Sequence, residues 1–146
     1  MIVYYLCRTS EVSELLTKGL VRSQGRHYMF SRWHDAALLL SGLYRQPGGD
    51  TDPHVALVIE ADEDMLAASA IPESRLPGSL RPDDIRQLQE HSWYAEVDVS
   101  AHRIRDVKNG FGGSIRNRFE ITQTGRTPIW RFLAYARPYL RYVGAA

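Results

Sequence analysis

The sequence is poor in the features that mark secreted and membrane proteins. It has one cysteine, Cys7, so no disulfide bond can form within the chain, which fits a reducing compartment. No apolar run approaches the roughly 20 residues that a membrane-spanning helix needs, and no basic stretch precedes an apolar one at the amino terminus. We therefore expect a cytoplasmic protein that has no membrane partner.

The sequence also lacks the common motifs of metal and phosphate sites. Its five histidines are scattered and have no metal-ligand spacing. It contains neither the glycine pattern of dinucleotide-binding folds nor that of phosphate-binding loops, and GFGGS at 110–114 has no lysine, which favours a hairpin turn. Cys7 lies in an apolar run and is interpreted as a core residue. We predict no metal site.

The length and the charge distribution are informative. A chain of 146 residues with a mean hydropathy of −0.33 fits one soluble domain over residues 1–146. Residues 1–100 carry nine basic and fifteen acidic residues, whereas residues 101–146 carry nine basic and two acidic ones. The basic carboxyl-terminal segment either attracts the acidic part of the same domain or binds an external partner, such as a nucleic acid or an acidic protein.

The first thirty residues predict a strand, a helix and a second strand. Residues 2–7 are β-branched and aromatic, which indicates a strand buried on both faces. Thr9 and Ser10 suit a helix N-cap, and Gly19 suits the residue that ends the helix. Residues 27–31 predict the second strand. We expect the two strands to be neighbours, with the turn at 8–10 at the mouth of a cleft between them.

The remaining elements alternate between helices and strands. Ser31 suits the cap of a helix over about 33–43, and Pro82 suits the first residue of another. The other predicted elements are strands at His54–Glu60, 93–99, 104–107 and 116–122, and a last helix capped by Thr127. This order predicts an α+β fold, a single domain with a mixed sheet and a central cleft.

Six segments in this order resemble the ADP-ribosyltransferase superfamily. The first strand of that superfamily, which ends in a basic residue and Thr, resembles YYLCRTS, and the following helix, which ends in Gly, resembles EVSELLTKGL. Its second strand, which ends in Ser, resembles HYMFS, its next helix resembles HDAALLL, and its apolar third strand resembles HVALVIEA. WYAEVDVSAHRIRDV resembles the strand that carries the catalytic glutamate in DNA-modifying toxin-type members. The resemblance covers about residues 2–107 and implies an ADP-ribosyltransferase-like fold.

The resemblance also implies a reaction and a set of site residues. NAD would be the co-substrate, and ADP-ribose would be transferred to a protein or a nucleic acid. Glu96 takes the place of the catalytic glutamate, with Glu120 in NRFEIT as the alternative. The positions matching NAD-binding residues are Arg8, Thr9, Tyr28, Ser31, Trp33 and Tyr44.

These residue types suit that chemistry. A carboxylate stabilises the positive charge of an oxocarbenium-like transition state, a guanidinium pairs with pyrophosphate, and an aromatic ring stacks on nicotinamide. Each also has an ordinary structural interpretation: Glu96 as a solvated strand residue, Ser31 as an N-cap, Trp33 as a packing anchor.

A second hypothesis is a small cytoplasmic binding protein or inhibitor without turnover, which presents a basic surface to a nucleic acid or an acidic protein. The predicted partner surface is arginine-rich, and it consists of Arg116, Arg118, Arg126 and Arg131. Arg116 and Arg118 are expected to share one face because they lie two apart on a predicted strand.

Overall fold

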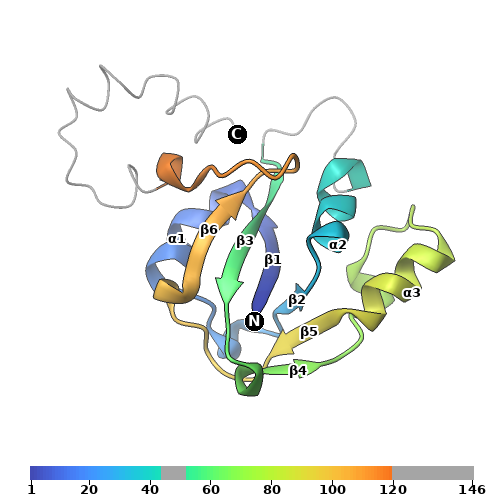
Figure 1. Cartoon of the computed structure of the whole chain (residues 1–146), viewed down its shortest axis with the longest axis horizontal. Coiled ribbons are helices and arrows are strands. Elements are labelled where there is room, and N and C mark those ends of the chain that lie inside the picture. The colour runs from blue at the N-terminus through green and yellow to red at the C-terminus, as the bar shows by residue number, and fades with distance from the viewer. Residues whose placement is uncertain (44–51, 120–146) are drawn as a thin grey trace.

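The computed structural model describes residues 1–43 and 52–119 of the chain (Figure 1). Predictions for Tyr44, Glu120, Arg126, Arg131 and the last helix lie outside these residues.

Six strands form one sheet in the order β4-β5-β2-β1-β3-β6. Their bounds are β1 Ile2–Arg8, β2 Tyr28–Phe30, β3 His54–Glu60, β4 Leu66–Ala68, β5 Ser92–Ala95 and β6 Ile104–Lys108. All five pairings are antiparallel, so the α+β class is confirmed but the predicted mixed sheet is wrong. The physical reason is that strands of like direction are kept apart: β2 and β3 both run opposite to β1, which lies between them, and each outer strand runs opposite to its inner neighbour.

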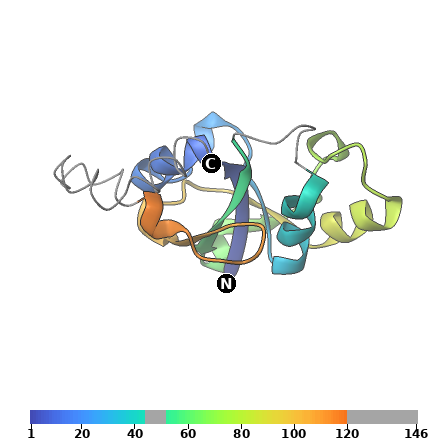
Figure 2. The same cartoon turned by 90° about the horizontal axis from the view of Figure 1, so that it is seen from above.

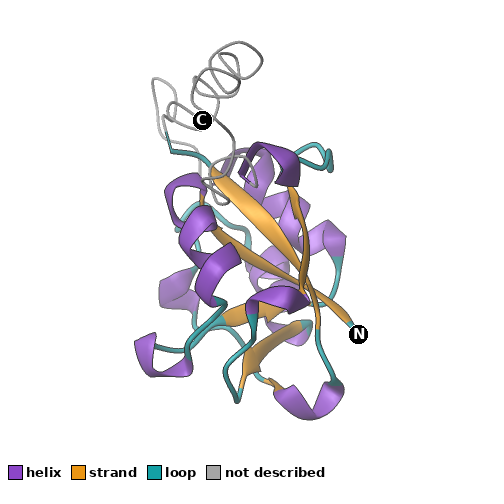
Figure 3. Ribbon diagram, turned by 90° about the vertical axis from the view of Figure 1, so that its left-hand side faces the viewer, coloured by secondary structure: helices purple, strands orange, loops and turns teal. Residues whose placement is uncertain are grey.

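Helices cover both faces of the sheet. The α-helices are α1 Val12–Lys18, α2 Trp33–Leu38 and α3 Pro82–Glu90, and a π-helical segment, Leu39–Leu43, follows α2. Figure 2 shows α1 on one side of β1 and β3, and α2 and α3 on the other. Figure 3 shows the helices and short helical turns lying on both sides of the strands. The sheet is therefore the middle layer of the described residues.

Side-chain alternation divides the core between these two faces. Val3 and Cys7 point to the α1 face and are buried with Val12 and Leu16, whereas Tyr4, Tyr5 and Leu6 are half-buried. The prediction that residues 2–7 are buried on both faces is therefore too strong. The α2 and α3 face has its own cluster, which contains Tyr28, Phe30, Leu39, Ile71, Leu76, Leu80 and Leu88.

Several predicted boundaries are corrected. The strand expected at 93–99 ends at Ala95, and the chain then bends until Val99 forms an isolated bridge with Leu20. Residues 116–119 are helical, not a strand. Gly19 ends α1 at φ 73°, as predicted, but Thr9 and Ser10 do not cap the helix, because their hydroxyls donate to Pro53 and Asp52.

Candidate functional site

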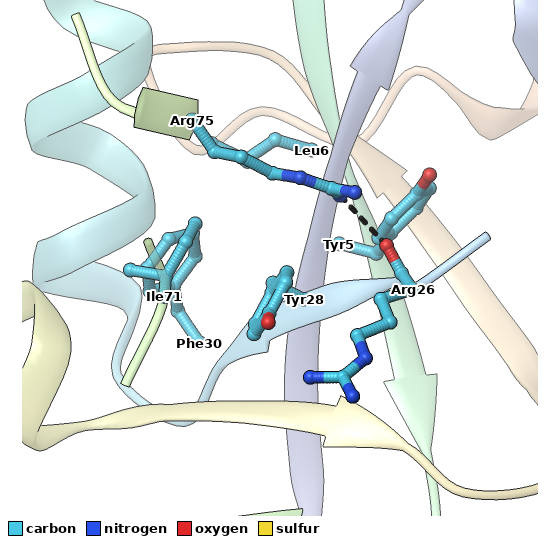
Figure 4. A pocket seen from close by; sticks show the side chains of 7 residues that line it. All are labelled: Tyr5, Leu6, Arg26, Tyr28, Phe30, Ile71 and Arg75. Carbon is cyan, nitrogen blue, oxygen red and sulfur yellow. Dashed lines mark hydrogen bonds between the residues drawn. The ribbon is translucent and has the colours of Figure 1, made fainter. Parts of the chain in front are cut away.

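The structure contains a cavity between β1 and β2, the pair of adjacent strands with the fewest paired residues. β1 pairs with β3 over seven residues, but with β2 only at Tyr4 and Phe30, so the two strands diverge beyond that pair. A cavity of about 150 Å³ lies there. It is lined from both strands and from the connection between β4 and α3, by Tyr5, Leu6, Arg26, Tyr28, Phe30, Ile71 and Arg75 (Figure 4).

The predicted cleft between the first two strands is thus present as a cavity, but the turn at 8–10 is not among its lining residues. The connection that leads to α3 contributes Ile71 and Arg75 to the wall of the cavity.

Two guanidinium groups and two tyrosine rings dominate the chemistry of the cavity. Arg75 Nη1 donates to the carbonyl oxygen of Arg26 at 2.8 Å, and its guanidinium lies 5.3 Å from the centre of the Tyr28 ring. Figure 4 shows the Arg75 side chain extended across the cavity toward that carbonyl. Arg26 lies 5.4 Å from the centre of the Tyr94 ring, and a hydrogen bond with the Tyr28 side chain raises the pKa of Arg26 further.

This positive charge has no acidic counterpart in the cavity wall. No carboxylate is among the lining residues, and neither Arg26 nor Arg75 forms an ion pair with any residue in 1–43 or 52–119. Two uncompensated guanidinium groups beside an aromatic wall suit a ligand that joins a planar ring to an anion such as phosphate.

A second cavity, of about 220 Å³, lies on the α1 side and shares Tyr5 with the first. His27 Nε2 donates to the Val21 carbonyl at 2.9 Å, which leaves Nδ1 to accept the hydrogen bond from the Tyr5 hydroxyl at 3.2 Å. Burial raises the pKa of Tyr5 to about 12, so its hydroxyl stays protonated at neutral pH. Tyr5 is therefore a fixed wall between the two cavities.

Tyr28 is the predicted site residue that the structure places in the first cavity. Ser31 instead donates from its hydroxyl to the His91 carbonyl at 3.3 Å, and the N-cap of α2 is Arg32. Trp33 packs edge-on against Tyr4, with ring centres 5.3 Å apart, and is not among the cavity residues.

Arg8 and Thr9 hold the segment that enters β3. Arg8 Nη1 donates to the Asp52 carbonyl at 3.3 Å, and the buried Thr9 hydroxyl donates to the Pro53 carbonyl at 2.7 Å. Desolvation acts to raise the pKa of Asp52, but hydrogen bonds from the Ser10 hydroxyl and backbone N–H outweigh it and keep that pKa below its usual value. These contacts are structural, and none of them faces the cavity.

Glu96 lies in a bend one residue past β5 and is not among the cavity residues. Tyr94 pairs with Tyr28, Ala95 N donates to the His27 carbonyl, and Glu96 N donates to the Met65 carbonyl, so the ladder extends one residue past β5. Extending the β2–β5 register by two residues sets the Glu96 backbone opposite Arg26. Glu96 is exposed.

The predicted arginine surface is only partly described, and its geometry is corrected. Arg116 and Arg118 lie in a helical turn, where residues two apart point in nearly opposite directions, so they do not share a face. The Arg116 guanidinium donates to the Ile104 carbonyl, which ties it to the edge strand β6.

Arg26 and Arg75 were missed by the sequence interpretation. A signal existed for Arg26, because it precedes Tyr28 by two residues and so has the strand parity of Tyr28 and Phe30. Arg75 lies in a proline-containing connection with no periodicity, so only the tertiary fold brings it to the cavity.

Comparisons with known proteins do not assign the chain to a family. No family model, curated protein or solved structure matches it. Within the described residues, no helix is long and apolar enough to cross a membrane, and no group of three His, Cys, Asp or Glu side chains is placed to hold a metal ion. The cavity between β1 and β2 is therefore the candidate ligand site of this chain.

Proposed function

We propose that this protein has an ADP-ribosyltransferase-like fold and transfers ADP-ribose from NAD to a macromolecule. The observation that carries the proposal is the cavity between β1 and β2, where Tyr28 meets two arginines that have no acidic partner among the described residues. NAD combines planar rings with a pyrophosphate, which is the chemistry that this wall suits.

The size of the cavity limits what enters it. A cavity of about 150 Å³ is large enough for a single six-membered ring, since an engineered cavity of about that volume binds benzene. We infer that one ring enters beside Tyr28 and Phe30. The pyrophosphate would remain outside, within reach of the exposed Arg26 and Arg75 side chains.

Glu96 is the candidate catalytic residue. When the bond between nicotinamide and ribose breaks, positive charge develops on the ribose, and a nearby carboxylate stabilises it. Two observations support this role: extending the β2–β5 register by two residues sets the Glu96 backbone opposite Arg26, and the exposure of Glu96 leaves room for a substrate to cover it. The electrostatic attraction between the carboxylate and the positively charged ribose would become stronger as the substrate excludes water from the carboxylate.

The test is transfer of label from NAD to cell-lysate protein or nucleic acid by the wild-type chain and two matched variants. Glu96→Gln should lower the rate by about 100-fold or more, the cost of removing one group that stabilises transition-state charge. Glu63→Gln removes another exposed carboxylate, in the turn before β4, and should not change the rate. Equal rates for wild type and Glu96→Gln would contradict the role of Glu96, and loss of transfer in Glu120→Gln alone would assign the role to Glu120.

One observation favours the second candidate, a binding protein without turnover. Arg8 and Thr9, the residues that the resemblance assigns to NAD, are engaged by Asp52 and Pro53. No NAD binding at millimolar concentration, together with binding of a nucleic acid or an acidic protein, would support this candidate, whereas saturable NAD binding would favour the enzyme.

A further inference from the structure

A glycine-rich turn after β6 exposes one aromatic ring almost completely. Phe111 is 90% exposed, whereas the other exposed large hydrophobic residues in 1–43 and 52–119 lie between 37% and 46%. The turn follows the last strand, at the top of Figure 1. A ring this exposed is available to make contact with a ligand.

The turn is held in one conformation by its own hydrogen bonds. Asn109 Oδ1 accepts from the N–H groups of Phe111 and Gly113, both at 3.0 Å. The backbone of Asn109 also donates to Gly113 and accepts from Gly112, both at 3.0 Å. Gly112 has φ 81°, a conformation that glycine adopts without strain. Phe111 is therefore presented on an ordered turn, which lowers the entropic cost of binding through it.

A cation and a second aromatic ring lie at the base of this turn. Lys108 Nζ is 5.4 Å from the centre of the Trp33 ring, and Trp33 also lies against Gly112, where an added Cβ would be 3.7 Å from Cζ2. Lys108 forms no salt bridge with the described residues, unlike Arg103 and Arg105, which pair with acids. Residues 101–119 contain five basic residues and one acidic residue, and because Arg103 and Arg105 are neutralised by Asp62 and Glu60, Lys108 is the cation that the turn itself offers to a ligand.

We propose that the Phe111 turn, residues 108–113, stacks on an unpaired base of a single-stranded nucleic acid, with Lys108 contacting a phosphate. Phe111 offers an exposed ring for stacking, and Lys108, three residues earlier in the chain, offers a cation for the backbone phosphate. A protein hot spot would need a surround of apolar side chains that excludes water, whereas Phe111 is flanked in the chain by Gly110 and Gly112 and is 90% exposed. Duplex bases are already stacked and do not offer a free face.

This inference names the acceptor class and in that respect rests on the proposed transfer of ADP-ribose, but the binding itself needs no NAD. The chain should bind a fluorescently labelled single strand of about 16 nucleotides at low salt, measured by anisotropy without NAD. Phe111→Ala should weaken binding by about 5- to 150-fold, the loss of one base stack, and Phe111→Trp should restore it. The logarithm of the binding constant falls linearly with the logarithm of the salt concentration. Lys108→Ala should make this slope shallower by about 0.7, because one phosphate contact on the single strand is lost.

The controls separate this surface from general effects. Val97→Ala shortens an exposed apolar residue outside the turn and should leave binding unchanged. Thermal melting should be the same for Phe111→Ala and wild type, because the ring is exposed. Absence of binding at low salt, or equal affinities of Phe111→Ala and wild type, would overturn the proposal. If the chain labels protein in the presence of NAD but does not bind single-stranded nucleic acid, nucleic acid is excluded as the acceptor. The proposed transfer of ADP-ribose would not be affected by that result.

Discussion

Arg75→Ala should separate a ligand-binding arginine from a structural one. Arg75 is exposed, and its described contacts are one hydrogen bond to the Arg26 carbonyl and one stacking contact with Tyr28. An exposed cation–π contact contributes about 0.5–1 kcal/mol, so the loss of folding free energy should be small. A charge-assisted hydrogen bond to a bound anion contributes about 1.5–3 kcal/mol. We therefore expect NAD affinity to fall by about 10- to 150-fold.

Calorimetric titration of NAD measures this effect. Arg75→Lys keeps the charge but loses the planar fork and the stack, so its affinity should lie between wild type and Arg75→Ala. Arg86→Ala is the matched control, because Arg86 is an exposed arginine on α3 that pairs with Asp83 and does not line the cavity. The reasoning would be refuted if Arg75→Ala and Arg86→Ala bound NAD equally well.

Three predictions concern the scaffold. Gly19→Ala should cost about 2 kcal/mol or more in urea unfolding, because its Cβ would lie 2.1 Å from the Val99 carbonyl oxygen at φ +73°, while Gly78→Ala, in open space, should be nearly neutral. Ser92→Ala should cost about 1–3 kcal/mol in the same assay, since the buried hydroxyl accepts from one backbone N–H and donates to another residue's carbonyl. The lowered pKa of Asp52 means that its contribution to stability is present above its unfolded pKa, about 3.9, and is lost as the pH falls through the folded pKa. Thermal melts below about pH 4 should therefore show a weaker pH dependence for Asp52→Asn than for wild type, and equal slopes would contradict this role.

The central strands were predictable because their sequences leave few alternatives. β1 and His54–Glu60 are apolar and β-branched, which suits buried strands, and Gly19 adopts the positive φ that ends α1. β4 was missed because three residues, Leu66–Ala68, give too short a pattern. The alternation of arginine with other residues in 116–119 predicted a strand. These residues are instead helical, and Phe119 is buried in the core on the α1 side.

The candidate site was predictable only where it follows a strand. Tyr28 belongs to a short strand whose alternation can be read in the sequence, and it pairs with Tyr94 on β5. Arg75 reaches the cavity from a connection whose path depends on Ile71 and Leu76 entering the core between α2 and α3. Such a contact joins residues 49 apart in sequence, and no local pattern encodes it.

The central claim is that NAD binds in the cavity between β1 and β2, and amide chemical shifts recorded during an NAD titration test it most directly. We predict saturable shifts at Tyr28, Phe30 and Arg75, which line that cavity, and little change at Leu15 and Gln24, which line the cavity on the α1 side. The account would be contradicted by an absence of shifts at millimolar NAD, or by shifts confined to the α1-side cavity.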